Sequence, residues 1–347
     1  MSDNSEAVSK SAPVPRWKRL LQNLALSVFV FGLCFIGLEI VLRVAGYGNL
    51  EIYAPDEQLY WRLKPDQDCY TKVGRKPVHI NSHGTRGAEF VEAKPVNTIR
   101  ILSLGDSRTF GWGLTEDETY SARLGKLLQE KLGPGRHVEV INAGVNAWSY
   151  PQMLVYFRER GLKFQPDVVV LGEANLWTQF SEHNSPEFAR AFMRRVWLKN
   201  FLRHFAMYHY FVEIKLEHFY QQHRAKFIPV DPKQDQLFKE QQQADPDAVF
   251  RDAMLSICQL AKTNGVQPVL LSMPIAGDWT LTNTPVPVRC KREVSKRLEV
   301  PLVDVTPDIQ PEGNGLYLEA DPVHFDARGN EIIGRRLFET VSPLIKP

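Results

Sequence analysis

Cysteine is scarce in this 347-residue sequence, and neither sign of charge is in excess. No two of the four cysteines form a C-x-x-C pair, so no zinc or thioredoxin-like site is indicated. Cys34 lies in an apolar N-terminal run. Two alternatives stay open for the other three, Cys69, Cys258 and Cys290. They can form one disulfide and leave one thiol, or all three can be unpaired. A net charge of +2 indicates no nucleic-acid partner.

Charged residues are absent from residues 20–38, which are rich in Leu, Val, Phe and Ile. A basic cluster precedes this run, made of Arg16, Lys18 and Arg19. About 20 apolar residues span a bilayer, and the positive-inside rule then predicts a cytoplasmic N-terminus. We expect a cytoplasmic tail over 1–19 and a signal-anchor transmembrane helix over 20–46. A cleaved signal peptide is the alternative, but its apolar region is shorter and no A-x-A site follows this run.

Internal repeats and low-complexity segments are absent as well. Residues 47–98 carry Pro and Gly with little periodicity, and we expect an extended lead-in there. Beyond them, β-rich runs alternate with helical periodicity, which is typical of βαβ units and a parallel sheet. The expected strands lie at 99–104, 138–142, 168–171, 268–272 and 301–305, and the expected helices at 120–132, 152–161, 248–264, 289–298 and 329–341. The sequence therefore predicts an α/β fold over 99–347, a three-layer α/β/α sandwich around a five-stranded parallel sheet.

The alternation is interrupted between the third and fourth expected strands, where we expect a helical insertion at about 178–245. Residues 188–227 within it are aromatic and basic. One interpretation is a helical lid or a membrane-surface patch. The other is a pair of amphipathic helices packed on the core with solvated charges.

The first expected strand runs directly into Gly105-Asp106-Ser107. A serine just past a strand end sits where the chain turns and backbone N–H groups point outward, so a hydroxyl and an oxyanion donor lie together. Serine needs an adjacent base to act as a nucleophile. A Ser or Asp helix cap is the alternative for so short a motif.

A base and its orienting carboxylate precede the last expected helix, at His324 and Asp321. At this spacing the carboxylate can accept the N–H of one ring nitrogen and leave the other free to take a proton from serine. A metal site would need further ligands at suitable spacing, and none is evident, so we expect neither metal nor cofactor. Asp326 suits the N-cap of the last helix.

Together these motifs resemble the SGNH/GDSL hydrolase family, in its membrane-anchored, extracytoplasmic form. The resemblance implies a flavodoxin-like sandwich in which Ser107 is the nucleophile and His324 and Asp321 complete its triad. It also implies an oxyanion hole formed by the N–H groups of Ser107 and Gly144 and the side chain of Asn175. The segment 81–87, Asn-Ser-His-Gly-Thr-Arg-Gly, resembles a lead-in of anchored members.

The third block of the family, G-x-N-D, departs from its pattern here. The sequence is Gly172-Glu173-Ala174-Asn175-Leu176, so Glu173 stands where glycine is expected and Leu176 replaces aspartate. A carboxylate aimed into the hole would oppose an oxyanion. We therefore expect Glu173 to point away, bonded to a basic or backbone partner.

The function implied by the resemblance is that of a serine ester hydrolase that acts through an acyl-enzyme. Its expected substrates are acyl esters, such as acetyl esters, of extracytoplasmic glycans or lipids, in the periplasm or at the cell surface. O-acyl transfer to polysaccharide hydroxyls uses the same acyl-enzyme and stays open. A catalytically weak glycan-binding module is a third alternative, although the intact Ser, His and Asp argue against it.

Overall fold

Five short β-rich runs form one parallel sheet. Its strands are β5 (Thr98–Gly105), β6 (His137–Gly144), β7 (Val168–Leu171), β8 (Gln267–Ser272) and β9 (Leu302–Asp304). All neighbouring strands are parallel, in the order β6-β5-β7-β8-β9. Numbered from the first strand of this sheet, that order is the 2-1-3-4-5 order of flavodoxin-like sheets. The predicted fold class is confirmed.

The computed structural model describes residues 15–48, 53–71, 74–175, 194, 197–199, 201–216, 219, 246–280, 285–319 and 321–345. Most of the predicted insertion at about 178–245 lies outside them. Besides the elements bounded elsewhere in the text, the described residues form α2 (Ser107–Phe110), η1 (Gly161–Phe164), η2 (Tyr208–Leu216), η3 (Asp278–Thr280), α10 (Thr306–Ile309), η4 (Gln310–Leu316) and η5 (Ser342–Leu344).

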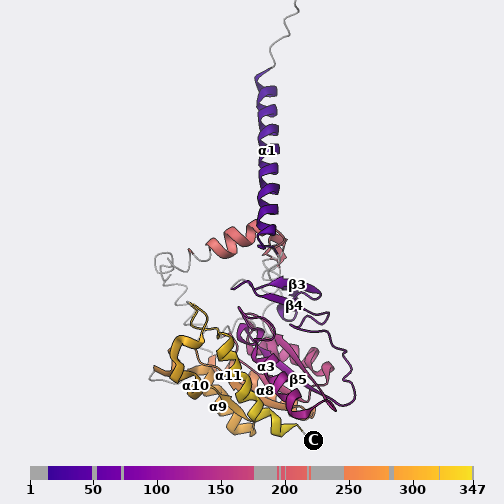
Figure 1. Cartoon of the computed structure of the whole chain (residues 1–347), viewed down its shortest axis with the longest axis vertical. Coiled ribbons are helices and arrows are strands. Elements are labelled where there is room, and N and C mark those ends of the chain that lie inside the picture. The colour runs from indigo at the N-terminus through magenta and orange to yellow at the C-terminus, as the bar shows by residue number, and fades with distance from the viewer. Residues whose placement is uncertain are drawn as a thin grey trace, which may run out of the picture.

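Helices cover both faces of the sheet because successive side chains of a strand point to opposite faces. On one face, Ile101 belongs to a buried cluster with side chains of α3 (Tyr120–Leu132) and α11 (Ala327–Val341). On the other, Leu102 belongs to a cluster with α4 (Tyr150–Glu159), α8 (Pro246–Thr263) and α9 (Val286–Leu298). The result is the three-layer sandwich seen in Figure 1.

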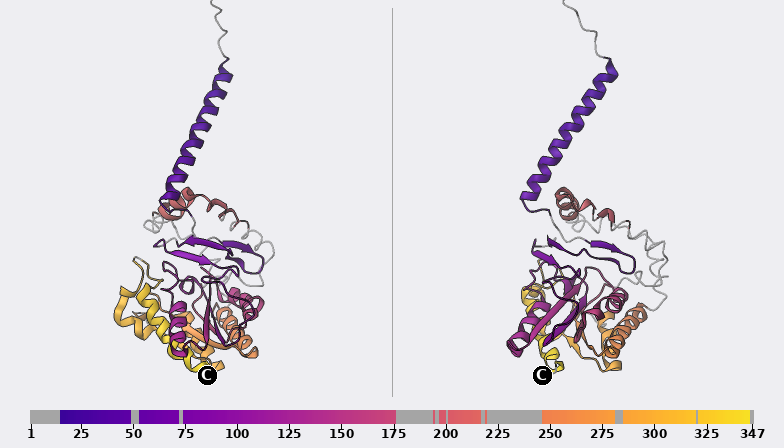
Figure 2. Two further views of the ribbon diagram at one scale, coloured as in Figure 1. Left: turned by 45° about the vertical axis from the view of Figure 1, so that its right-hand side comes forward. Right: turned by 90° about the vertical axis from the view of Figure 1, so that its right-hand side faces the viewer.

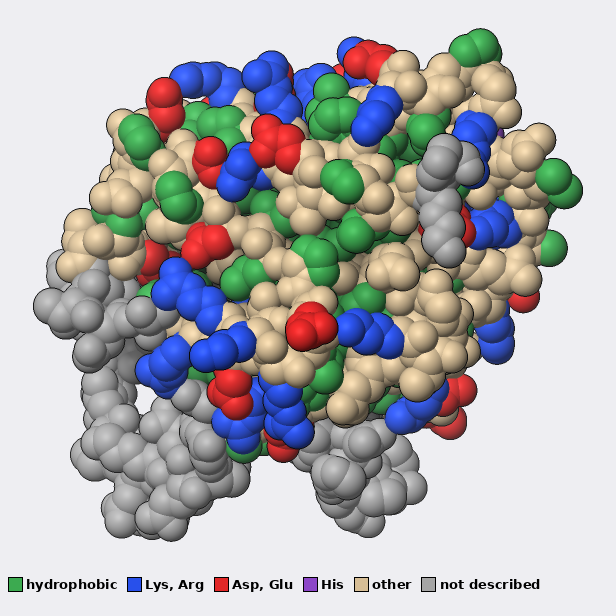
Figure 3. All heavy atoms as spheres, turned by 90° about the horizontal axis from the view of Figure 1, so that it is seen from below, with side chains coloured by type: hydrophobic (Ala, Val, Ile, Leu, Met, Phe, Trp, Pro, Cys, Tyr) green, Lys and Arg blue, Asp and Glu red, His purple; other side chains and the backbone are tan. Residues whose placement is uncertain are grey.

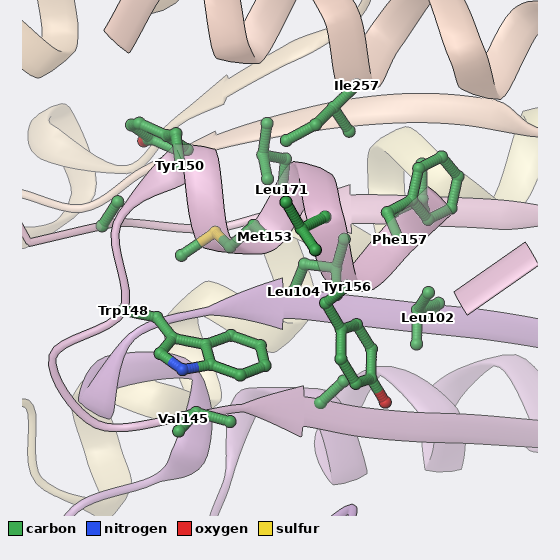
Figure 4. Packing of buried hydrophobic residues seen from close by; sticks show 14 of the residues in the cluster. Leu102, Leu104, Val145, Trp148, Tyr150, Met153, Tyr156, Phe157, Leu171 and Ile257 are labelled. Atoms are coloured by element: carbon green, nitrogen blue, oxygen red, sulfur yellow. The ribbon is translucent and has the colours of Figure 1, made fainter. Parts of the chain in front are cut away.

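A large aromatic side chain fixes the loop that follows β6. Trp148 is fully buried, and Figure 4 shows it between Val145 and Tyr156, close to the carboxyl end of the sheet. Its indole N–H donates to the carbonyl of Trp61 at 3.0 Å. The loop after β6 is therefore anchored both in the core and to the segment that precedes the sheet.

The lead-in consists of two antiparallel hairpins, which the sequence analysis did not predict. They are β1 (Tyr53–Asp56) with β2 (Tyr60–Leu63) and β3 (Gln67–Tyr70) with β4 (Pro77–Ile80). Four-residue strands are too short to establish a period-2 pattern, which is why the sequence indicated only an extended segment. Figure 2 shows the hairpins between the sheet and the N-terminal helix.

The predicted membrane span falls on one long helix, α1 (Arg16–Val44). It projects away from the rest of the molecule (Figure 1), and its most apolar window is 0% buried. By length and composition it can serve as a membrane anchor or as a signal sequence. All four cysteines lie in the described residues and none of them forms a disulfide, so the alternative without a bridge is the one that the structure has.

Candidate active site

Ser107 is the first residue of α2, the short helix that follows β5. β5 ends at Gly105, and the N-cap Asp106 accepts a hydrogen bond from the N–H of Arg108 at 2.9 Å. The turn is tight, since a β-carbon on Gly105 would lie 1.8 Å from Oγ1 of Thr109. Ser107 is thereby held at the carboxyl end of the sheet, where open α/β sheets bind ligands.

The lead-in supports this short helix through Arg86. Its guanidinium donates to the carbonyls of Phe110, Gly111 and Leu114 at 2.6–2.8 Å, and it packs 4.9 Å from the Phe110 ring centre. Carbonyls at a helix end have no partner within the helix. Arg86 supplies that partner, which gives the segment resembling an anchored-member lead-in a structural role.

His324 reaches Ser107 across 217 residues of sequence. Its Nε2 lies 2.7 Å from the Ser107 Oγ, and its Nδ1 lies 2.6 Å from Oδ2 of Asp321. The other carboxylate oxygen of Asp321 accepts from the N–H groups of Val323 and His324 at 2.9 and 3.2 Å. The structure thus brings together the three residues that the sequence predicted as a triad.

Asp321 is suited to remain ionised. Burial disfavours its charged form, but the hydrogen bond and charge of His324 outweigh that effect and lower the pKa of Asp321 below its usual value. A carboxylate on Nδ1 holds the imidazole in the tautomer that leaves Nε2 as a proton acceptor. The His324 side chain is 17% exposed, so the pair is open to solvent on one side.

Two buried ion pairs lie close to Ser107. Nε and Nη2 of Arg108 lie 3.2 and 2.7 Å from the two carboxylate oxygens of Asp106. Burial raises the pKa of Asp106, but the charge of Arg108 more than offsets this and lowers it below its usual value. The guanidinium next to Ser107 is therefore matched by a carboxylate within hydrogen-bond distance.

The second pair involves Glu173, the residue that departs from the family pattern. Its Oε1 lies 2.5 Å from Nζ of Lys291 on α9 and accepts from the N–H of Met273 at 2.7 Å. Lys291 also donates to the carbonyl of Leu271 at 2.6 Å. Burial lowers the pKa of Lys291, while Glu173 opposes that shift. The expectation that Glu173 is bonded to a basic and a backbone partner is confirmed.

Gly144 stands where β6 meets the short serine helix. A β-carbon there would lie 2.2 Å from the backbone nitrogen of Phe110, so no larger residue fits. Its N–H donates to Oδ1 of Asn142 at 3.1 Å, and the Asn142 amide donates to the carbonyl of Thr109 at 2.9 Å. In this structure the Gly144 N–H already has an acceptor, and the glycine permits close packing of two backbones.

The turn that follows contains a strained residue. The N–H of Trp148 bonds to the carbonyl of Val145 at 3.1 Å, and Ala147 has φ of 64°, as at the third position of a type II turn. The indole N–H of Trp61 donates to the carbonyl of Asn146 at 3.0 Å. In a trans peptide the N–H points opposite to the carbonyl, so the Ala147 N–H points away from Trp61. Among the described residues, this N–H has no hydrogen-bond acceptor.

Asn175 follows β7 and lies beside the same turn. Its N–H donates to the carbonyl of Trp148 at 2.8 Å, and two residues earlier the carbonyl of Glu173 accepts from the N–H of Asp106 at 2.9 Å. This segment therefore bonds both to the serine loop and to the loop after β6. Within the described part of the chain, the Asn175 amide forms no hydrogen bond.

Trp112 is a site residue that the sequence analysis did not identify. Its ring centre lies 6.0 Å from that of His324, and its N–H bonds to the carbonyl of Ser107 at 3.1 Å. The sequence Gly-Trp-Gly after the serine motif was the only available signal. The described residues contain no group of three or more His, Cys, Asp or Glu side chains that could hold a metal.

Comparison with known proteins gives one family match. The model of the GDSL-like lipase/acylhydrolase family matches residues 103–265. That stretch includes Ser107, Gly144 and Asn175 and ends before Asp321 and His324. No curated protein matches the sequence.

Several solved structures resemble the chain at low sequence identity. A lipase/acylhydrolase from Enterococcus faecalis is 18% identical, with 72% of this chain and 98% of that chain covered and a TM-score of 0.44. The psychrotrophic esterase EstA from Pseudoalteromonas sp. is 12% identical, with 71% and 97% covered and a TM-score of 0.43. The acetyl xylan esterase AlAXEase is 17% identical, with 70% and 100% covered and a TM-score of 0.42.

Proposed function

We propose that this chain is a serine ester hydrolase of the GDSL-like lipase/acylhydrolase family. The observation that carries the proposal is the continuous line from the Ser107 Oγ through His324 to Asp321, with separations of 2.7 and 2.6 Å. A serine becomes a nucleophile when a base lies within hydrogen-bond reach and a third group orients that base. Acyl transfer to serine is the chemistry that this arrangement performs.

In the proposed reaction, His324 Nε2 takes the hydroxyl proton while Ser107 Oγ attacks the carbonyl carbon of the ester. The tetrahedral intermediate collapses to an acyl-enzyme, and the departing alkoxide takes the proton from His324. Water then attacks the acyl carbon, with His324 again as the base, and the second tetrahedral intermediate releases the acid as the bond to Ser107 Oγ breaks and this oxygen takes the proton back from His324. Asp321 stays ionised throughout and stabilises the imidazolium.

The oxyanion of the intermediate needs preorganised donors. We assign this role to the N–H of Ser107, the amide of Asn175 and one N–H from the loop after β6. For the last of these we favour Ala147 over Gly144, because the Gly144 N–H is bonded to Asn142 whereas the Ala147 N–H has no acceptor among the described residues. The orientation of this peptide is held by the Trp61 indole N–H, which donates to the Asn146 carbonyl.

The test is hydrolysis of aryl acetates and of acetylated glycans by the purified chain. Ser107→Ala or His324→Ala should lower kcat by roughly 10⁴ or more, because triad members act as a unit. Adding a sugar acceptor to each reaction separates hydrolysis from transfer, since transfer yields an acylated sugar instead of free acid. Full activity in both variants would refute the assignment.

We further propose that α1 is an uncleaved anchor, with a cytoplasmic tail over 1–19 and with the lead-in at 47–98 and the hydrolase domain at 99–347 outside the cytoplasm. Support comes from the basic cluster that precedes an uncharged apolar run. A reporter fused after Pro347 should read as extracytoplasmic, and the mature protein should retain its N-terminal residues. A new N-terminus near residue 46 would identify a cleaved signal peptide instead.

A further inference from the structure

An exposed apolar surface lies at the foot of α1. It is formed by side chains of the described part of the insertion, and we call it the insertion surface. Its residues are Trp197, Leu198, Phe201, Phe211, Val212 and Leu216, which are between 39% and 61% exposed. Exposed large apolar side chains gathered in one segment point to an interaction site in a folded protein.

The insertion surface is attached to α1 by polar contacts. Glu39, near the end of α1, accepts hydrogen bonds from the N–H groups of Ala206 and Met207 at 2.8 and 3.1 Å. Arg43 bonds to Glu39 at 2.7 Å and also to the carbonyl of His204. Glu39 and Arg43, the charged residues that follow the uncharged run of α1, therefore hold the insertion at a defined level along this helix.

A row of aromatic rings continues from the insertion surface onto α1. Trp197 stacks on Phe201 with ring centres 6.0 Å apart, and Phe201 meets Phe205 at 5.9 Å. Phe205 in turn meets Phe35 of α1, also at 5.9 Å. Phe35 belongs to the uncharged run at 20–38, so the insertion surface is continuous with the surface that α1 offers to lipid.

The contact between α1 and the insertion lies at the depth of the edge of a bilayer. The uncharged run at 20–38 rises about 28 Å, close to the roughly 30 Å of a hydrocarbon core. Glu39 then lies at the boundary, and the segment bonded to it lies at the same depth. Trp and other aromatic residues concentrate at that depth, and exposed lysines such as Lys199 and Lys215 can reach the headgroups.

We propose that the insertion surface is a second membrane contact, which lies in the headgroup–acyl boundary of the bilayer that α1 enters. The proposal rests on the proposed anchoring by α1 and not on the ester chemistry. Figures 1 and 2 show the described helices of the insertion at the end of α1, on the side away from the C-terminus. The opposite face, in Figure 3, carries Lys, Arg, Asp and Glu intermingled with scattered apolar side chains, as suits contact with water.

The test measures the depth of single spin labels in the full chain, reconstituted in phosphatidylcholine–phosphatidylglycerol vesicles. The background is Cys34→Ala, since the other three cysteines are buried. Labels are attached through Phe201→Cys or Leu216→Cys, with Val96→Cys as the matched control on an 89% exposed side chain remote from α1. Labels at 201 and 216 should collide more with oxygen than with a water-soluble nickel complex, and the label at 96 should do the reverse.

Two outcomes would overturn the proposal. Labels at 201 and 216 that behave like the label at 96 would show a surface in water. Labels shielded from both reagents would show burial against protein, as in a lid or a second copy of the chain. Co-flotation of every variant with the vesicles tests anchoring separately, and aryl acetate hydrolysis in the same samples tests the ester chemistry. A failure of the anchoring or of the ester chemistry can therefore be distinguished from a failure of the insertion surface to contact the membrane.

Discussion

At the scale of single residues, the proposed chemistry depends on how donors and the imidazole are held before substrate arrives. The carboxylate of Asp321 makes three hydrogen bonds, one to the ring of His324 and two to backbone N–H groups. The two backbone bonds hold the carboxylate in place, and the carboxylate in turn holds the His324 ring in the orientation that faces Ser107. Together with the Ser107 N–H, the Ala147 N–H and the side-chain amide of Asn175 are the proposed oxyanion donors.

Asn175→Ala tests the least conventional member of this group. Removing one oxyanion donor should lower kcat by roughly 10²–10³, with little change in KM, because the donor acts when charge develops. The measurement is steady-state hydrolysis of an aryl acetate. Asn314→Ala, at an exposed position, is the control and should be neutral. An unchanged kcat in Asn175→Ala would show that backbone N–H groups alone form the oxyanion hole.

Asp321 also predicts a dependence of stability on pH. Its pKa is lowered in the folded chain, so its contribution is present above the unfolded value near 3.8 and is lost as pH falls through the folded pKa. The wild type should therefore lose more free energy of unfolding between pH 5 and pH 2 than Asp321→Asn does. Urea denaturation at both pH values measures this difference. Equal losses in the two chains would contradict it, and Asp252→Asn serves as an exposed control.

At the scale of elements, the site is built where loops leave neighbouring strands. Asn142 ties the end of β6 to the serine helix, and the carbonyl of Glu173 ties the loop after β7 to Asp106. Lys291 then ties Glu173 to α9. The position of Ser107 is thus determined by contacts between elements, each of which can be tested apart from the proposed triad.

Gly144→Ala should displace the serine helix. The added β-carbon would overlap the backbone of Phe110, which cannot move as a flexible side chain could. Overpacking of this kind costs typically 1–3 kcal/mol, and the shift of Ser107 should lower kcat as well. Thermal unfolding and aryl acetate kinetics measure the two effects. Gly315→Ala, with open space around it, should change neither.

The buried pair of Glu173 and Lys291 should be costly to break. Glu173→Gln leaves a buried ammonium without its counter-charge, and we expect a loss of about 3–5 kcal/mol in the free energy of unfolding. Lys291→Met alone should cost a similar amount. The double variant Glu173→Gln with Lys291→Met should recover part of the loss, because no uncompensated charge remains. Strict additivity in urea denaturation would show that the pair is not coupled.

At the scale of the whole molecule, the lead-in connects α1 to the candidate active site. It contacts the serine helix through Arg86 and the loop after β6 through Trp61. The same segment lies between the sheet and α1 (Figure 2). The lead-in therefore supports the candidate active site and is more than a spacer.

Trp61→Phe tests this role. The change keeps an aromatic ring but removes the N–H that holds the Asn146 carbonyl, a bond worth about 0.5–1.5 kcal/mol. If this bond orients the Ala147 N–H, kcat should fall by up to about tenfold while KM changes little. Tyr70→Phe, on the exposed side of the other hairpin, should leave kcat unchanged. A rise in KM alone would indicate a contact with substrate instead.

Local patterns in the sequence were enough to predict the sheet, its flanking helices and the long N-terminal helix, since hydrophobic periodicity is a property of adjacent residues. The serine motif and the Asp321–His324 pair were also visible, because each is confined to a few consecutive residues. That these two motifs meet at 2.7 Å is a consequence of the parallel sheet, which carries both to one edge.

Other features were decided by tertiary structure alone. The partner of Glu173 comes from a helix far along the chain, and no local pattern identifies Lys291 as that partner. The Gly144 N–H bonds to Asn142 only because of the rotamer of that side chain, and the Ala147 N–H, which has no acceptor among the described residues, depends on a turn held by Trp61. No local pattern indicates that Glu39 and Arg43 of α1 bond to backbone groups at 204–207, about 160 residues further along the chain. In each case the deciding interaction joins residues distant in sequence, and such pairings are set only when the chain has packed.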